Sequence, residues 1–202
     1  MPSIYDLKPA FQRLLRPTVR VLAHAGATPN HITLAALTLS CAVGALIAAQ
    51  PGARGLLLLL PAALLLRMAL NALDGMMARE LGMSSRLGAV LNELGDVVSD
   101  TVLYLPLALV PGVPPGPVAL AVVLAVIAEM AGVVAVQIGA ARRYDGPMGK
   151  SDRAFVFGAL GLTLGLGAPA GAWIAVVLWL VVALLVLTIW TRARRALRQG
   201  KA

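Results

Sequence analysis

The side chains best suited to chemistry lie between Asn71 and Asp100, where two very apolar segments meet a short polar link. An α-helix turns by roughly 100° per residue. Asn71, Asp74 and Ala78 therefore share a narrow face of one helix, and Arg67 lies one turn earlier. Carboxylate and amide oxygens of this kind are ligands for hard divalent ions such as Mg²⁺, which proteins often share with substrate phosphates.

A second polar face follows the link. Asn92, Asp96 and Asp100 fall within about 80° of one another on the next helix. Glu93 lies at the edge of that arc. Because two helices joined by a short connection pack side by side, the two polar faces can point at each other. The sequence therefore predicts one site built from two helices.

The spacing of this stretch resembles the signature of the CDP-alcohol phosphatidyltransferases, D-x-x-D-G-x-x-A-R-x8-G-x-x-x-D-x-x-x-D. The residues that match it are Asp74, Gly75, Ala78, Arg79, Gly88 and Asp96. The first and third acidic positions carry Asn71 and Asn92 instead. The resemblance implies a membrane enzyme of phospholipid synthesis that forms a homodimer. The alternative is that these polar residues only hold two membrane helices together.

The composition indicates an integral membrane protein. Of the 202 residues 59% are hydrophobic and 13% are charged, against about 25% charged in soluble domains. No linker or low-complexity tract divides the chain, so we expect a single membrane domain over residues 1–202. Cys41 is the single cysteine and excludes an intramolecular disulfide. The net charge of +8 gathers at the ends of apolar segments, which argues against a nucleic-acid partner.

Apolar patterning predicts an all-α fold, with six transmembrane helices after an interfacial amphipathic helix. Residues 1–25 alternate apolar and basic side chains at helical spacing, which is typical of a helix in the headgroup region. A helix docked on the protein is the alternative. The expected spans of a bundle over residues 31–190 are 31–50, 56–71, 86–109, 118–140, 154–168 and 172–190. Thr28 and Pro29 should start the first span, a turn should fall at Gly82–Ser85, and residues 191–202 should form a basic tail.

Basic residues predict the orientation. With the amino terminus in the cytoplasm, fifteen lysines and arginines fall inside, and Arg54 alone falls outside. This distribution places both termini, the basic tail and the polar site on the cytoplasmic side of a bacterial-type inner membrane.

The resemblance also implies roles for the site residues. Such an enzyme transfers a phosphatidyl group from CDP-diacylglycerol to a small polar alcohol and expels CMP. Asp96 matches the general base that takes the proton of the alcohol. The implied ligands of Mg²⁺ or Mn²⁺ are Asn71, Asp74, Asn92 and Asp96, and the nucleotide-binding positions are Asp74, Gly75, Ala78, Arg79 and Gly88. Because two asparagines lower the charge of four signature positions from −4 to −2, we hypothesise that Asp100, or else Glu93, joins the metal site.

Other basic residues have two interpretations each. Arg142, Arg143, Lys150 and Arg153 would bind a phosphorylated acceptor, although membrane topology alone also explains them. Arg67 would contact a phosphate of the acceptor or pair with an acid, for which Glu129 is a candidate. Glycines at 158, 161 and 165 have the spacing of closely packed helices.

Two further functions stay open at this point. The asparagines are compatible with an inactive paralogue that binds a CDP-lipid without turnover. A transporter would need polar residues and broken helices near the middle of the bilayer in two related halves, and the sequence has neither.

Overall fold

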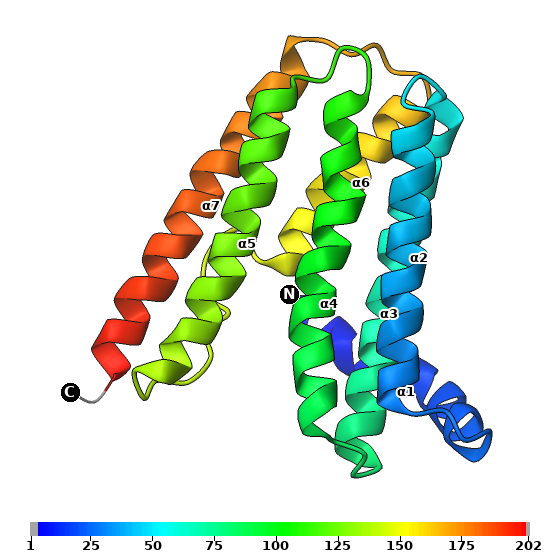
Figure 1. Ribbon diagram of the computed structural model, residues 1–202, viewed down its shortest axis with the longest axis vertical. Coiled ribbons are helices and arrows are strands. Elements are labelled where there is room, and N and C mark those ends of the chain that lie inside the picture. The colour runs from blue at the N-terminus through cyan, green and yellow to red at the C-terminus, as the bar shows by residue number, and fades with distance from the viewer. Residues whose placement is uncertain (1–3, 201–202) are drawn as a thin grey trace. The chain divides into compact units, whose positions relative to one another are not determined.

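The protein is all-helical over the residues that the structure describes (Figure 1). The structure is a computed structural model that describes the backbone of residues 4–200 and the side chains of residues 12–200. Within this range there is no strand, so the all-α prediction is confirmed. The elements are α1 (Ile4–His24), α2 (Pro29–Ala49), η1 (Arg54–Leu58), α3 (Leu59–Glu80), α4 (Arg86–Tyr104), η2 (Leu105–Leu109), α5 (Pro115–Gln137), α6 (Lys150–Gly165) and α7 (Ala172–Gln199).

Each expected span corresponds to one α-helix, with η1 and η2 extending α3 and α4. Among the described helices, four are long and apolar enough to cross a membrane, namely α2, α3 with η1, α5 and α7. The other two differ for simple reasons. Helix α4 has four charged side chains among its 19 residues, and α6 is only 16 residues long. Length and composition thus identify four of the six expected spans.

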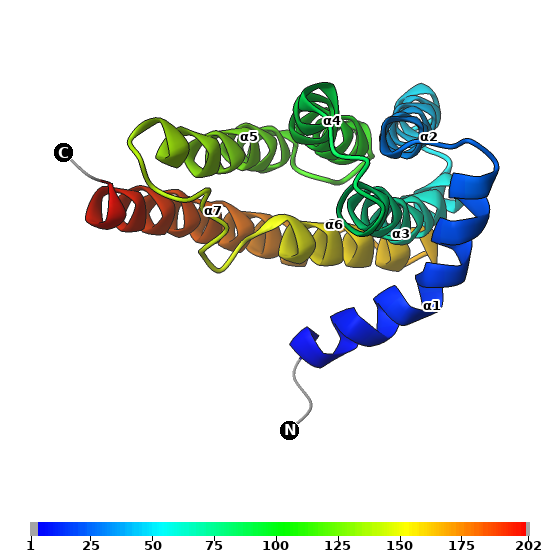
Figure 2. The same ribbon diagram turned by 90° about the horizontal axis from the view of Figure 1, so that it is seen from below.

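The chain divides into two compact units, and α2, α3 and α4 contribute residues to both. The first unit comprises residues 1–42 and 63–99, and the second comprises residues 43–62 and 100–202. In the first unit, α1 runs crosswise to α2 (Figures 1 and 2). The hydrophobic core that these helices share with α3 contains Val19, Ile32, Leu73, Met76 and Met77.

Helix α1 has one face on the protein and another that is exposed. Val19 is buried in the core, whereas Leu14 and Val21 are 73% and 68% exposed. Arg16 donates from Nε and Nη2 to the two carboxylate oxygens of Glu80, the last residue of α3, at 3.1 Å each. The helix is therefore docked on the first unit, and it still presents apolar and basic side chains outward.

In the second unit, α5 and α7 lie side by side and α6 packs against η1 (Figures 1 and 2). A Cβ on Gly161 would lie 3.0 Å from the carbonyl oxygen of Leu57, and one on Gly165 would lie 2.7 Å from Cδ2 of Leu58. The glycine spacing predicted for close packing is therefore used within the chain, between α6 and η1.

Candidate active site

A tight link holds the ends of α3 and α4 together. Gly82 has a φ of +67°, a conformation that residues with a side chain rarely adopt. The hydroxyl of Ser84 donates to the carbonyl oxygen of Ala78 at 2.9 Å. The hydroxyl of Ser85 accepts from the amide of Gly88 at 2.9 Å and so caps the start of α4. The predicted turn is confirmed, and it sets the two polar faces next to each other.

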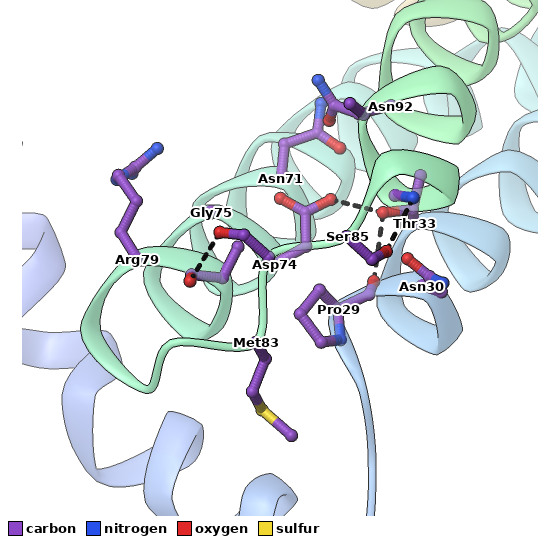
Figure 3. A pocket seen from close by; sticks show the side chains of 14 residues that line it. Pro29, Asn30, Thr33, Asn71, Asp74, Gly75, Arg79, Met83, Ser85 and Asn92 are labelled. Carbon is purple, nitrogen blue, oxygen red and sulfur yellow. Dashed lines mark hydrogen bonds between the residues drawn. The ribbon is translucent and has the colours of Figure 1, made fainter.

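A pocket of about 330 Å³ lies between α3, α4 and the start of α2, all within the first unit (Figure 3). This volume is typical of a small-molecule site. All residues that match the signature line it except Asp96, and both substituted asparagines line it too. They are Asn71, Asp74, Gly75, Ala78, Arg79, Gly88 and Asn92. The first predicted polar face therefore meets one residue of the second, Asn92, in this cavity, whereas Asp96 does not line it.

Asp74 is fixed to the wall of this pocket through α2. It is 5% exposed, and the hydroxyl of Thr33 donates to its Oδ2 at 2.8 Å (Figure 3). The same hydroxyl lies 3.1 Å from the carbonyl oxygen of Pro29, so its single proton has two acceptors within reach. Helix α2 begins at Pro29, and Thr28 Oγ1 accepts from the amide of His31 at 3.4 Å, as predicted for an N-cap. This capped start positions Thr33 against Asp74.

Two of the signature glycines make room for polar side chains. A Cβ on Gly88 would lie 2.8 Å from Oδ1 of Asn30, and one on Gly75 would lie 3.0 Å from Nη2 of Arg79. The far ends of Asn30 and Arg79 therefore lie close against bare helix backbone, where a larger residue would push them away. The glycines thus leave room for these two side chains beside the helix backbone.

Asp96 lies against Arg67 and Asn71. Arg67 is 3% exposed, and its Nη2 donates to Oδ1 of Asp96 at 3.2 Å and to the main-chain oxygen of Asp96 at 3.0 Å. Asn71 donates from Nδ2 to the same Oδ1 at 3.1 Å. The Asp96 side chain is 24% exposed and can be approached from outside the protein. Arg67 therefore pairs with Asp96.

The first unit offers oxygen ligands suited to a divalent ion. The carboxylate of Asp74 and the amides of Asn71 and Asn92 line the same pocket. Mg²⁺ and Mn²⁺ bind oxygens of this kind and complete their shells with water and substrate phosphates. Within the described part of the chain, no three His, Cys, Asp or Glu side chains gather where they could hold a metal ion. The oxygen atoms of the pocket therefore fit a divalent ion that is held by few protein carboxylates and also binds phosphate oxygens of a substrate.

The two further acids proposed for this site have different surroundings. Asp100 belongs to the second unit and is 5% exposed. Arg153 donates to its Oδ2 from Nε at 3.2 Å and from Nη2 at 2.9 Å, so a guanidinium balances its charge. Glu93 belongs to α4 in the first unit and is partly exposed.

In the second unit, three arginines surround Glu129 of α5. Nη2 of Arg153 lies 3.0 Å from Oε1, while Oε2 lies 3.5 Å from Nη2 of Arg142 and 3.4 Å from Nη1 of Arg192. Arg153 and Arg192 are each 1% exposed. We call Glu129, Arg142, Arg153 and Arg192 the arginine cluster. Four residues in this part of the chain were predicted to bind the acceptor, and the cluster contains two of them, Arg142 and Arg153.

The loop between α5 and α6 holds a separate set of charges around Asp145. Arg143 donates from Nε to Oδ2 of Asp145 at 2.6 Å, and Arg195 donates to Oδ1. Burial by itself raises the pKa of Asp145, but the hydrogen bonds and positive charges of Arg143 and Arg195 outweigh it and hold that pKa below its usual range. Arg143 also donates to Gln199 at 2.6 Å, and Lys150 begins α6. These two residues stand outside the arginine cluster.

Arg192 is the functional candidate that sequence analysis misses. It falls within the predicted basic tail, yet it is buried and donates from Nε to the carbonyl oxygen of Asp145 at 3.1 Å. The signal was its register, because Leu178, Leu185, Thr188 and Arg192 follow one another on the buried stripe of α7. An arginine in line with an apolar stripe indicates a buried ion pair rather than a tail.

Known proteins resemble this chain over most of its length. The sequence profile of the CDP-alcohol phosphatidyltransferase family matches residues 26–190. The inner membrane protein YnbA of Escherichia coli strain K12 is 47% identical over 195 residues, which are 96% of this chain and 94% of that protein.

Among solved structures, the phosphatidylinositol phosphate synthase of Mycobacterium tuberculosis has the same fold. Its structure with CDP-DAG bound has a TM-score of 0.77 at 24% identity, covering 91% of this chain and 94% of that one. Its complex with manganese and citrate has a TM-score of 0.75 at 24% identity, covering 90% and 88%. The matched profile spans most of the sequence, including the whole pocket, and this chain belongs to the CDP-alcohol phosphatidyltransferase family.

Proposed function

We propose that this protein transfers a phosphatidyl group from CDP-diacylglycerol to a small polar alcohol and releases CMP, as a step of phospholipid synthesis. The observation that carries the proposal is the pocket in the first unit. There Asp74, Gly75, Ala78, Arg79 and Gly88, all parts of the family signature, line one cavity of about 330 Å³. Membership of the family supports the same reaction class.

Asp96 is the proposed general base. It takes the hydroxyl proton of the acceptor alcohol, whose oxygen forms a bond to the phosphorus that bears diacylglycerol. The bond from this phosphorus to the bridging oxygen breaks, and its electron pair leaves with CMP. Arg67 and Asn71 both donate to Oδ1 of Asp96 and hold the carboxylate in place for this proton transfer.

Asp74 and the amide oxygens of Asn71 and Asn92 are the proposed ligands of Mg²⁺ or Mn²⁺. When bound, the ion neutralises negative charge on the diphosphate of the lipid substrate. The Thr33 hydroxyl orients the Asp74 carboxylate for this role. The small residues Gly75, Ala78 and Gly88, with Arg79, form the proposed nucleotide-binding wall, and their places in the pocket support this role.

For the membrane arrangement we propose six spans, which adds α4 with η2 and α6 to the four identified by length and composition. Helix α1 lies at the interface, with exposed Leu14 and Val21 in contact with lipid. The excess of basic residues predicts a cytoplasmic site and cytoplasmic termini in the inner membrane. A relative named as an inner membrane protein supports this location, and the family resemblance supports a homodimer.

We further propose a phosphorylated acceptor. Three arginines face Glu129, and one of them also balances Asp100, so guanidinium groups outnumber carboxylates in this part of the second unit. Lys150→Ala should raise the KM for a phosphorylated alcohol and leave that for CDP-diacylglycerol unchanged. Arg153→Ala should do the same if the variant folds. An unchanged acceptor KM in both variants would refute a phosphorylated acceptor.

The reaction is tested with purified protein, labelled CDP-diacylglycerol, Mg²⁺ or Mn²⁺ and a panel of alcohols, with CMP as the readout. CMP release should require both the ion and one of the alcohols. Asp96→Asn should bind CDP-diacylglycerol and release no CMP. Binding without release by the wild-type protein would instead identify an inactive CDP-lipid-binding paralogue. Absence of binding, together with solute flux in proteoliposomes, would identify a transporter.

A further inference from the structure

Arg67 and Asp96 form an ion pair beside the candidate active site, in contact with Asn71, which lines the pocket. Arg67 lies one helical turn before Asn71 on α3 and is 3% exposed. A buried guanidinium is stable only when an anion and hydrogen-bond acceptors compensate it. Asp96 provides both, because it accepts from Arg67 with its side chain and with its main-chain oxygen, at 3.2 and 3.0 Å.

The direction of the Asn71 amide follows from the same carboxylate. An ionised carboxylate only accepts hydrogen bonds, so Asn71 must present Nδ2 to Asp96 Oδ1, 3.1 Å away. An aspartate at position 71 would put two acceptors in contact, and they would need a proton or a positive charge beside them, which the Arg67 guanidinium already supplies. Asn71 and Arg67 therefore have the same role, because both donate a hydrogen bond to Oδ1 of Asp96.

The net charge of the site limits how many divalent ions it can bind. With acids at all four signature positions, the site would carry −4, whereas Asn71 and Asn92 reduce it to −2. The buried guanidinium of Arg67 reduces it further to −1. One divalent ion would bring these five positions to +1, and Arg79, which also lines the pocket, adds a further positive charge that suits a diphosphate substrate. A second divalent ion would have to bind beside a fixed guanidinium, at a carboxylate that is already paired with it.

We propose that Arg67 is a built-in cation of this site, and that the protein consequently binds a single divalent ion, on the Asp74 side of the pocket. Arg67 is then a positioning residue for Asp96, which the guanidinium holds whether or not the divalent ion is bound. This inference rests on the proposed function for the role of Asp96, but its test needs no turnover.

The test counts Mn²⁺ ions per chain by equilibrium binding to the purified full-length protein, with free Mn²⁺ measured by its electron paramagnetic resonance signal. The wild-type protein should bind one ion. Asn71→Asp should also bind one, because the guanidinium still occupies Asp96. The double variant Arg67→Gln with Asn71→Asp should bind two. Gln50→Glu and Arg20→Gln, which change the net charge by the same steps at exposed positions, should remain at one ion.

Several outcomes would overturn the proposal. They are two ions or none on the wild-type protein, a second ion on Asn71→Asp alone, or only one ion on a folded double variant. Thermal unfolding verifies folding, and the wild-type and Asn71→Asp counts decide the matter if the double variant does not fold. One Mn²⁺ without CMP release would refute the proposed function alone, while CMP release with two Mn²⁺ would refute the built-in cation alone.

Discussion

The pocket of the first unit and the arginine cluster of the second unit use charged side chains in opposite ways. In the pocket, amides, hydroxyls and glycines separate the charges and leave a cavity of about 330 Å³. In the arginine cluster, three guanidinium groups lie within 3.5 Å of one carboxylate, and two of those arginines are 1% exposed. The comparison teaches that an apolar chain can hold polar and charged side chains in two ways. It can space them around an open pocket, or it can pair them with one another among buried side chains.

The most direct test of the difference between the pocket and the arginine cluster is a substitution of Asp74. Asp74→Asn keeps the shape of the pocket and removes a negative charge, so CMP release should fall roughly 10²–10³-fold. The measurement is the initial rate of CMP release at saturating CDP-diacylglycerol. Asp152→Asn is the matched control, because Asp152 is an exposed acid of the second unit. Equal rates in the two variants would mean that the pocket is not the active site.

Removing the acid of the arginine cluster should affect stability. Glu129→Gln leaves three arginines without their shared anion, so the free energy of unfolding should fall by about 3 kcal/mol. Unfolding in detergent, followed by circular dichroism, measures it. Glu80→Gln is the control, because the exposed pair of Glu80 with Arg16 contributes about 0–1 kcal/mol. Equal stability of both variants would show that the cluster is available to bind anions rather than structural.

Thr33→Val sharpens the comparison by changing a neighbour of Asp74 rather than Asp74 itself. The variant keeps the size of the side chain and removes the donor at 2.8 Å from Oδ2. The affinity for Mn²⁺ should fall about tenfold, as is common when a residue that orients a metal ligand is lost. Equilibrium Mn²⁺ binding measures the change, and Thr191→Val, at an exposed hydroxyl of α7, is the control. Unchanged affinity would place the ion away from Asp74.

The smallest expected effect concerns Asp145, which lies outside the arginine cluster. Because Arg143 and Arg195 hold the pKa of Asp145 below its ordinary value of 3.8, the folded state favours the ionised form. This stabilisation is complete above the ordinary value and is lost as the pH falls through the lowered pKa. Asp145→Asn should therefore lose less stability on acidification below about pH 4 than the wild-type protein does. Parallel acid-unfolding curves would contradict this assignment.

Local patterns were sufficient to predict much of the fold. The start of α2 at Pro29 and the turn at Gly82 depend on neighbours in sequence, so capping and turn chemistry reveal them, whereas α6 begins at Lys150, four residues before the predicted span. The lining of the pocket was also predictable in large part, because helical periodicity puts Asn71, Asp74 and Ala78 on one face.

Partners far apart in sequence could not be predicted in the same way. Thr33 and Asp74 are 41 residues apart, and Arg67 and Asp96 are 29 apart. Several acids lie at suitable depth in the apolar segments, so the sequence alone could not assign Arg67 to Asp96 rather than to Glu129. Which acid an arginine reaches depends on how helices rotate about their axes, and small packing residues along their whole length determine that rotation.

Filling the pocket requires little rearrangement of its α2 wall. An ion that draws on the Asp74 carboxylate leaves the Thr33 hydroxyl a second acceptor, the carbonyl oxygen of Pro29, 3.1 Å away. The proton can turn from one oxygen to the other by rotation about a single side-chain bond, so no buried donor loses its acceptor before or after binding. The Thr33 hydroxyl therefore keeps an acceptor before and after the exchange, and the backbone of α2 need not move.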